Sequence, residues 1–274
     1  MLTIPHQHRP STRHAVRATL SMSLMAAVLA SGLALSGAAP VAAQDGPPPP
    51  PGDIPPPPSD EGLTDISVSS PRFVTGRAVA KSGAVPIQLR WKARNAAGIS
   101  HYQVQLMRYP GPTYSDIKLG RSDATSTIRK LPLGTDLAIR VRAWDGFGNE
   151  SAWEVGQRFR VVKSGGRYAG NWRTKRDRGA IGRSIRQTGS KAAKATFATD
   201  ALSIAVVAQR SPRMGKAKIS VGGSSRTVQL RANRTSNRLV VHQRALAGGH
   251  SATMTVRRAR GTVNVDAFLA IVER

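Results

Sequence analysis

Apolar and polar residues alternate with a period of two along most of the chain after residue 62. Successive side chains of a β-strand point to opposite faces, so this alternation is typical of strands with one buried face. In the first half of this region the pattern covers residues 85–93, 99–106, 125–128, 137–143 and 159–162. In the second half it covers residues 193–197, 202–208, 217–221, 226–230, 238–242, 252–256 and 263–272. Gly- and Ser-rich turns separate the segments, so we predict an all-β fold of two antiparallel β-sandwiches.

Residues 1–43 have the pattern of a secretory signal peptide. Arg9, Arg13 and Arg17 precede an apolar run over residues 18–39, and small residues at Val41 and Ala43 suit cleavage before Gln44. The alternative is an uncleaved membrane anchor, because the run approaches spanning length. No later stretch is long and apolar enough to span a membrane. We therefore expect an extracellular or cell-surface protein with cleavage after Ala43 and no membrane span after signal removal.

Residues 44–62 form a proline-rich linker. Nine of the seventeen residues from Gln44 to Asp60 are Pro. Such runs favour extended polyproline II, which acts as a semi-rigid spacer without a core. The alternative is a ligand for a proline-recognising domain. With this linker, the predicted organisation is a signal peptide (1–43), a linker (44–62), a first β domain (63–163) and a second, basic β domain (167–274).

The first β domain resembles a fibronectin type III domain. The segment LPLGTDLAIRVRA at residues 131–143 is similar to the corner and penultimate strand of that family. The following WDGFGNESAW at residues 144–153 is similar to the next turn in bacterial members, and Trp91 matches the core tryptophan. The sequence departs from the family at Leu137, where a tyrosine usually ties down the corner. The resemblance implies an immunoglobulin-like sandwich that lacks one buried hydrogen bond, worth about 1 kcal/mol.

The second β domain resembles the galactose-binding-like jelly-roll domains that are appended to secreted bacterial glycosidases and proteases. Trp172, the strand at 195–197 and the segment GKAKISVGG at residues 215–223 carry the resemblance. LAGGHSATMTV at residues 246–256 and the closing VNVDAF at residues 263–268 complete it. A departure is Gly222, where relatives commonly have Asp. The resemblance implies a jelly roll in a carbohydrate-related context.

Charge is concentrated in this second domain. Residues 167–274 carry 22 Lys or Arg against four acids, which is +18 of the chain's formal +26. Such a surface attracts polyanions before any specific contact forms. The four acids, Asp177, Asp200, Asp266 and Glu273, leave few carboxyl groups for acid–base catalysis. The chain has no Cys, which excludes thiol nucleophiles and thiolate metal sites. We therefore expect no enzyme activity, no cofactor and no metal.

Three further functional sites can be proposed from polar or aromatic residues, and each of these residue sets can also be explained by an ordinary structural role. A Ser–His–Asp set can be written with His250 and Asp266, but no Gly-x-Ser-x-Gly elbow accompanies it. The turn from Asp145 to Asn149 offers oxygen ligands for calcium, although a structural turn explains it better. Trp172 and Tyr168 offer a platform for a neutral sugar, whereas the family pattern places Trp172 in the core.

Arginine clusters are the best candidates for ligand contact, because the guanidinium group binds phosphate, sulfate and carboxylate through two hydrogen bonds. Loops of a jelly roll gather at its two ends, so clusters far apart in sequence can share a face. The expected partner is an acidic glycan or cell-envelope polymer. The alternatives are extracellular nucleic acid bound by charge, and an accessory domain pair of a secreted glycosidase or protease system. The predicted contacts are Arg173, Arg176, Arg178, Arg213, Arg257, Arg258 and Arg260.

Overall fold

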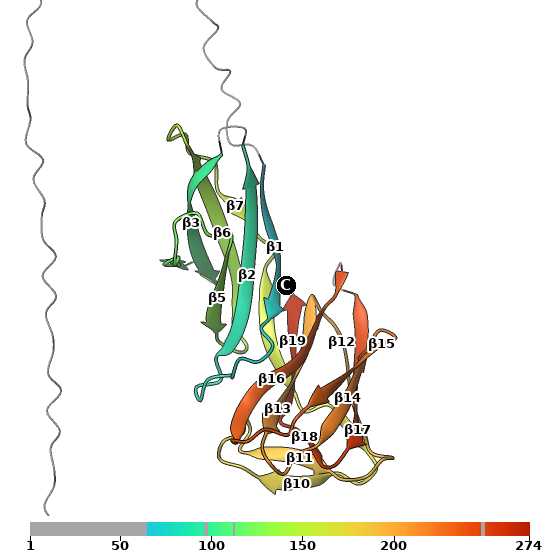
Figure 1. Ribbon diagram of the computed structural model, residues 1–274. Coiled ribbons are helices and arrows are strands. Elements are labelled where there is room, and N and C mark those ends of the chain that lie inside the picture. Colours follow the sequence, from blue (N-terminus) through green and yellow to red (C-terminus); the bar gives the residue numbers. More distant parts are fainter. Residues whose placement is uncertain (1–64, 96–97, 112, 248–249) are drawn as a thin grey trace, which may run out of the picture. The chain divides into compact units, whose positions relative to one another are not determined.

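The computed structural model describes residues 65–95, 98–111, 113–247 and 250–274 (Figure 1). The predicted signal peptide and the proline-rich linker lie outside the described residues, as does the rest of the chain before the first strand. Within them, the chain forms β-strands numbered β1 to β19, which confirms the all-β prediction. The pairings between these strands are antiparallel. The part of the chain that the structure describes contains no helix long and apolar enough to cross a bilayer.

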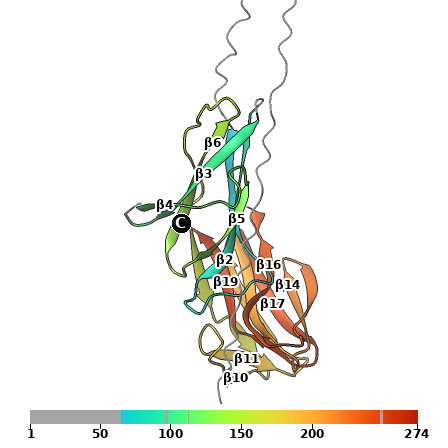
Figure 2. The same cartoon turned by 60° about the vertical axis from the view of Figure 1, so that its left-hand side comes forward.

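The first sandwich, β1 to β8, contains two sheets. One has the order β1-β2-β5, and the other runs β4-β3-β6-β8 with β7 paired to β6. In Figure 2, β4 lies at the edge beyond β3. This is the immunoglobulin-like arrangement that the sequence predicts. The strands are β1 (Asp65–Phe73), β2 (Val85–Arg94), β3 (Ile99–Arg108), β4 (Thr113–Asp116), β5 (Ser126–Leu131), β6 (Asp136–Asp145), β7 (Glu154–Val155) and β8 (Phe159–Ser164).

The core of the first sandwich follows from the alternation along its strands. Trp91 on β2 is 2% exposed, and its ring meets the ring of Tyr102 on β3 edge to face at 6.2 Å between centroids. The Tyr102 hydroxyl accepts a hydrogen bond from Ala93 N at 3.3 Å. Leu137 on β6 is fully buried, so its side chain fills the core at the position where the family has tyrosine. Trp91 is therefore a core residue, as the sequence predicts.

The second sandwich comprises β9 to β19. Its five-stranded sheet, of order β15-β14-β17-β12-β9, packs against the strands β16-β13-β19 and against a small sheet of order β10-β11-β18. The Phe197 ring on β12 stacks on the Phe268 ring on β19 across this core, at 5.5 Å between centroids. The first strands are β9 (Arg167–Ala169), β10 (Arg173–Arg176), β11 (Ser184–Thr188), β12 (Lys194–Asp200), β13 (Ser203–Arg210) and β14 (Lys216–Val221). The remaining strands are β15 (Ser224–Gln229), β16 (Ser236–Ala245), β17 (Ser251–Arg260), β18 (Val263–Val265) and β19 (Ala267–Glu273).

A single sheet joins the two sandwiches, because β8 pairs with β19 from Phe159 opposite Glu273 to Ser164 opposite Phe268. Leu269 and Ile271 on β19 belong to the same buried cluster as Phe159 on β8. The chain around residue 165 therefore passes from β8, which pairs with β19, to β9, which pairs with β12 in the five-stranded sheet. The proposed domain boundaries at 63–163 and 167–274 stay a prediction.

The turns β13–β14, β15–β16 and β17–β18 lie at one end of the second sandwich, which we call the loop end. Strand registers fix this position: Lys216 at the start of β14 pairs with Gln229 at the end of β15 and with Arg260 at the end of β17. Strand β10 pairs with β11, and β11 pairs with β18, which follows the last of these turns (Figures 1 and 2). Segments far apart in sequence are thus brought together at this end.

Candidate functional site

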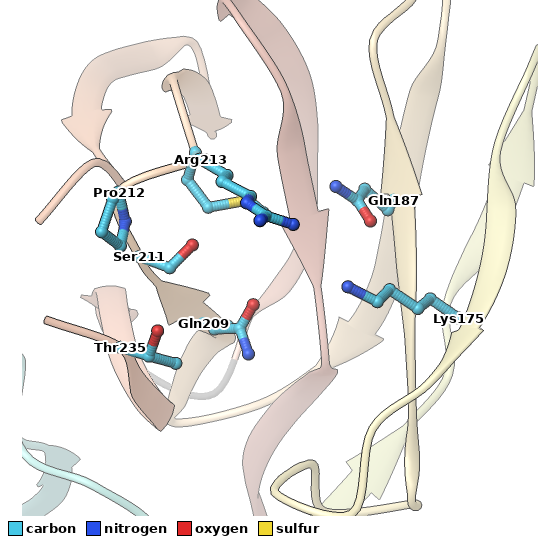
Figure 3. Close-up of a pocket in the computed structure, with 8 residues that line it drawn as sticks. Lys175, Gln187, Gln209, Ser211, Pro212, Arg213 and Thr235 are labelled. Atoms are coloured by element: carbon cyan, nitrogen blue, oxygen red, sulfur yellow. The ribbon is translucent and has the colours of Figure 1, made fainter.

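A cavity of about 510 Å³ opens at the loop end of the second sandwich. Figure 3 shows the guanidinium group of Arg213 and the amino group of Lys175 extending into it from opposite sides. The side chains of Gln187, Gln209 and Ser211 also face this space. Two cations from β10 and the β13–β14 turn therefore converge with amide and hydroxyl groups. The cavity is lined by Lys175, Gln187, Gln209, Ser211, Pro212, Arg213, Met214 and Thr235.

Strand β10 determines which of its basic side chains reach the cavities. Successive side chains along a strand point to opposite faces. Arg173 and Lys175 therefore lie on one face of β10, and Thr174 and Arg176 lie on the other. Arg173 is paired with Gln187 on β11, so their side chains share a face. Both line a second cavity, and Gln187 lines the first cavity as well. Arg176 therefore lies on the face opposite to the two cavity-lining cations.

Gln209 is held in place by hydrogen bonds that leave one of its polar atoms for a ligand. Its Nε2 donates to Asp177 Oδ2 at 2.8 Å and to Asn237 Oδ1 at 2.7 Å. Its backbone is fixed by Asn264, which accepts from Gln209 N at 2.8 Å and donates to Gln209 O at 2.9 Å. The Asn264 side chain is buried, so this pairing is not competed by water. Gln209 Oε1 accepts no hydrogen bond from the described residues, so it is available to a ligand on a rigid support.

The β13–β14 turn that carries Arg213 needs a glycine where it meets the β17–β18 turn. A Cβ on Gly215 would lie 1.8 Å from the carbonyl oxygen of Arg260, so no other residue fits without backbone movement. The close approach lets Gly215 N donate to Thr262 O at 2.6 Å. Gly215 O in turn accepts from Leu230 N at 2.9 Å. This glycine thereby fixes three turns against one another at the loop end.

Two smaller cavities adjoin the first. One, of about 480 Å³, shares Gln187 and contains Arg173, and the other, of about 230 Å³, shares Met214 and contains Arg260. We call the lining of the three cavities the loop-end groove. It contains six cations and no Asp or Glu, and no ion pair involves these cations within the described part of the chain. The six cations are Arg173, Lys175, Arg213, Lys216, Arg231 and Arg260.

The structure brings three of the seven predicted arginines into this groove: Arg173, Arg213 and Arg260. Arg176 and Arg178 are exposed but do not line it. Arg258 Nε donates to Gly261 O at 2.6 Å, which holds the β17–β18 turn. The roles of all seven as ligand contacts stay predictions.

Arg257 lies in a row of cations on the outer face of the five-stranded sheet. It is directly opposite Lys194 on β12 and Lys218 on β14. Neighbouring strands are about 4.8 Å apart. Like charges placed directly opposite each other destabilise a sheet. An anion laid along this row, which we call the cation row, would remove that repulsion.

Several polar and basic residues that line the groove are not among the seven predicted contacts: Lys175, Gln187, Gln209, Lys216 and Arg231. The signal for Lys175 was present, since it follows Arg173 at a spacing of two and therefore shares its face once the segment is a strand. The hydrophobic pattern predicts no strand over residues 173–176, so by itself it does not indicate this shared face. For Gln187 and Gln209 no sequence signal separates a cavity-lining amide from a solvated one.

The candidate calcium turn and the candidate sugar platform both have structural roles in the fold. Asp145 Oδ1 accepts from Phe147 N and Asn149 N, each at 2.9 Å, so this carboxylate stabilises the turn. The described residues contain no cluster of three or more His, Cys, Asp or Glu suited to a metal ion. Trp172 packs against the second core with its ring edge to face with that of Tyr168, at 5.1 Å between centroids. This arrangement is that of a core aromatic.

His250 and Asp266 lie in different parts of the second sandwich. His250 immediately precedes Ser251, which pairs with Asp200 at the end opposite the loop end. Asp266 accepts a hydrogen bond from Ile181 N, and its own backbone N donates to Val207 O at 2.8 Å. The strand registers therefore do not bring the two side chains together as a Ser–His–Asp set requires.

Comparison with known proteins gives structural neighbours only. No family model and no curated protein matches the chain. An exo-β-1,3-galactanase from Phanerochaete chrysosporium is 11% identical, with a TM-score of 0.31 over 74% of this chain and 56% of the galactanase. The present chain thus spans little more than half the length of that enzyme.

Two all-β modules also occur among these neighbours. A segment of two fibronectin type III domains from chicken tenascin is 18% identical, with a TM-score of 0.26 over 77% of this chain and 98% of the segment. A carbohydrate-binding module of the β-sandwich superfamily is 10% identical, with a TM-score of 0.24 over 75% of this chain and 98% of the module.

Proposed function

We propose that the protein is an exported, non-catalytic binding protein whose second sandwich binds an acidic polysaccharide through the loop-end groove. The observation that carries this proposal is the convergence of Arg213 and Lys175 on one cavity whose lining contains no acid (Figure 3). Cations without a protein counter-charge are free to pair with a ligand anion. Export rests on the predicted signal peptide.

The mixture of groups in the groove suits an acidic sugar better than a bare anion. Arg213 and Lys175 offer only donors, which match a carboxylate or sulfate group. Gln209 Oε1 is an acceptor, and the hydroxyl of Ser211 both donates and accepts. Sugar hydroxyl groups need both kinds of partner, whereas phosphate or sulfate alone needs donors. The groove therefore offers recognition of the sugar ring in addition to its charge.

The extent of the cationic surface supports a polymer as the ligand. Lys216 and Arg260 are paired in the sheet and line the groove, and Lys218 follows Lys216 on the same face of β14. Lys218 belongs to the cation row with Arg257 and Lys194. The groove and the cation row are thus neighbouring parts of one surface, which a chain with repeated acidic groups would contact at several points.

The test is binding of the full chain to carboxylated and sulfated polysaccharides, a neutral polysaccharide and double-stranded DNA, at about 0.05 M and about 0.2 M salt. The proposal predicts that one acidic polysaccharide keeps most of its affinity at the higher salt while DNA binding falls steeply. Equal loss of binding to every polyanion would mean that charge acts alone. Preferred binding to DNA that survives the higher salt would support the nucleic-acid alternative and contradict the proposal.

A further inference from the structure

A fourth cavity, of about 260 Å³, lies at the side of the second sandwich and shares no lining residue with the loop-end groove. It is formed where the end of β8, strand β9, strand β11 and the break between β18 and β19 meet. We call it the side pocket. Its lining includes Lys163, Ser164, Tyr168, Ser184, Arg186 and Asp266.

Asp266 supplies the acceptor in the side pocket. Its two carboxylate oxygens accept one backbone donor, Ile181 N, at 3.0 and 3.2 Å. A carboxylate has about four lone-pair sites, so acceptor capacity is left for a ligand. Burial raises the pKa of Asp266 to about 6, with Asp177 acting in the same direction and Arg238 and Lys163 in the opposite one. Asp266 is therefore largely ionised at neutral pH.

Lys163 and Arg186 supply the donors. The Lys163 amino nitrogen lies 3.8 Å from the position that a Cβ on Gly182 would take, and Gly182 also lines the pocket. The Arg186 guanidinium carbon lies 5.3 Å from the centroid of the Tyr168 ring. Neither cation forms an ion pair within the described part of the chain. Their hydrogen-bond donors are thus available beside the Asp266 acceptor.

The backbone around Gly166 forms a rigid wall of the pocket. Gly166 has a φ of 70°, and a Cβ there would lie 2.5 Å from Phe268 Cε2 and 2.9 Å from Thr196 O. Its N donates to Ser164 Oγ at 3.2 Å. The segment that connects β8 to β9 is therefore packed against the core, so the pocket has a fixed shape.

These groups select the chemistry of the ligand. A simple anion would be repelled by Asp266, and a simple cation by Lys163 and Arg186. A hydroxyl group donates one hydrogen bond and accepts others, so neighbouring hydroxyls use the carboxylate and the cations together. We propose that the side pocket binds one uncharged, hydroxyl-rich sugar unit, as a second site separate from the acidic-polymer groove. A volume of about 260 Å³ suits a single sugar ring and not a chain.

The experiment follows backbone amide resonances of the full chain during titration with glucose, mannose and galactose. Galacturonate and galactosamine serve as charged references with the same ring. The proposal predicts saturable shifts of the Ile181, Ser184 and Gly166 amides with at least one neutral hexose, and weaker shifts with both charged sugars.

The matched variants are Asp266→Asn and Asp200→Asn. Asn keeps a carbonyl oxygen for Ile181 N but removes the charged acceptor, so affinity for the hexose should fall at least about tenfold. Asp200 is an exposed acid outside the pocket, and its replacement should leave the affinity unchanged. Absence of shifts with every neutral hexose, unchanged affinity in Asp266→Asn, or binding of galacturonate alone would each overturn the proposal.

Discussion

Asp136 at the start of β6 is a buried carboxylate that pairs with three arginines, Arg158, Arg160 and Arg274. Arg158 Nη2 lies 2.6 Å from Asp136 Oδ2, and Arg160 Nε donates to Oδ1. The hydrogen bonds from Arg160 and Arg158 lower the pKa of Asp136 to about 2, against the opposing effect of desolvation. Because the folded state has the lower pKa, this carboxylate stabilises the fold above its unfolded value near 3.8, and the contribution is lost as pH falls through 2.

We predict that Asp136→Asn unfolds at a lower temperature than the parent chain at pH 7, because the three arginines lose their counter-charge. The difference should narrow below pH 4 and vanish near pH 2. Thermal denaturation across this pH range measures it, with the exposed Asp65→Asn as the control. A difference that stays constant from pH 7 to pH 2 would show that ionisation of Asp136 is not its cause.

Arg238 on β16 ties distant segments together. Its Nε donates to Val79 O at 3.0 Å and its Nη1 to Gly179 O at 2.7 Å, while its backbone has a φ of 54°, which L residues rarely adopt. We predict that Arg238→Ala lowers the free energy of unfolding by about 2 kcal/mol through the loss of two charge-assisted hydrogen bonds. Arg234→Ala, at an exposed turn position, should change it by less than about 0.5 kcal/mol. Chemical denaturation measures the free energy of unfolding of both variants. Equal losses would contradict the claim that Arg238 holds these segments together.

At the scale of elements, the sequence predicted strands well where one face is buried and poorly where none is. β2, β3 and β6 follow from alternation, because every second side chain enters a core. β10 has four exposed side chains and therefore carries no hydrophobic pattern. The predicted final strand is divided at Asp266, since β18 and β19 belong to different sheets. A strand that is defined only by its hydrogen-bonded partners can be identified from the tertiary structure but not from the hydrophobic pattern.

The cation row gives a prediction that separates stability from binding. Arg257 is directly opposite two lysines, so Arg257→Gln should raise the free energy of unfolding by about 0.2 to 1 kcal/mol at low salt. The gain should shrink at about 1 M salt, where the Debye length is about 3 Å. Binding of an acidic polysaccharide should weaken in the same variant. A loss of stability in Arg257→Gln would contradict the repulsion argument.

At the scale of the whole molecule, the continuous sheet through β8 and β19 couples the two sandwiches. Leu269 on β19 is fully buried in the cluster that also contains Trp91. Leu269→Ala should cost about 2 to 5 kcal/mol. We predict that amides in β2 and β6 then exchange with solvent faster, together with those of β13 and β19. Val155→Ala, at an exposed position, is the control. Faster exchange confined to β13 and β19 would show that the sandwiches unfold independently.

The candidate site was predictable in its charge and only partly in its residues. Clustering of arginines outside the predicted strands led to Arg173, Arg213 and Arg260, and Arg213 and Arg260 lie at predicted turns, which gather at the ends of a sandwich. Arg258 was not separable from them, since its hydrogen bond to Gly261 O depends on the path of the turn. The side pocket had no sequence signal, because it forms from four segments that approach only in the folded chain.

The measurement that tests the central claim most directly compares two charge-matched double variants of the full chain for binding to polygalacturonate at about 0.15 M salt. Arg173→Gln with Arg213→Gln removes two groove cations, and Arg176→Gln with Arg178→Gln removes two cations outside the groove. The account predicts that the groove pair loses at least about tenfold more affinity than the other pair. Equal losses would mean that net charge alone attracts the polymer and would contradict a site in the groove.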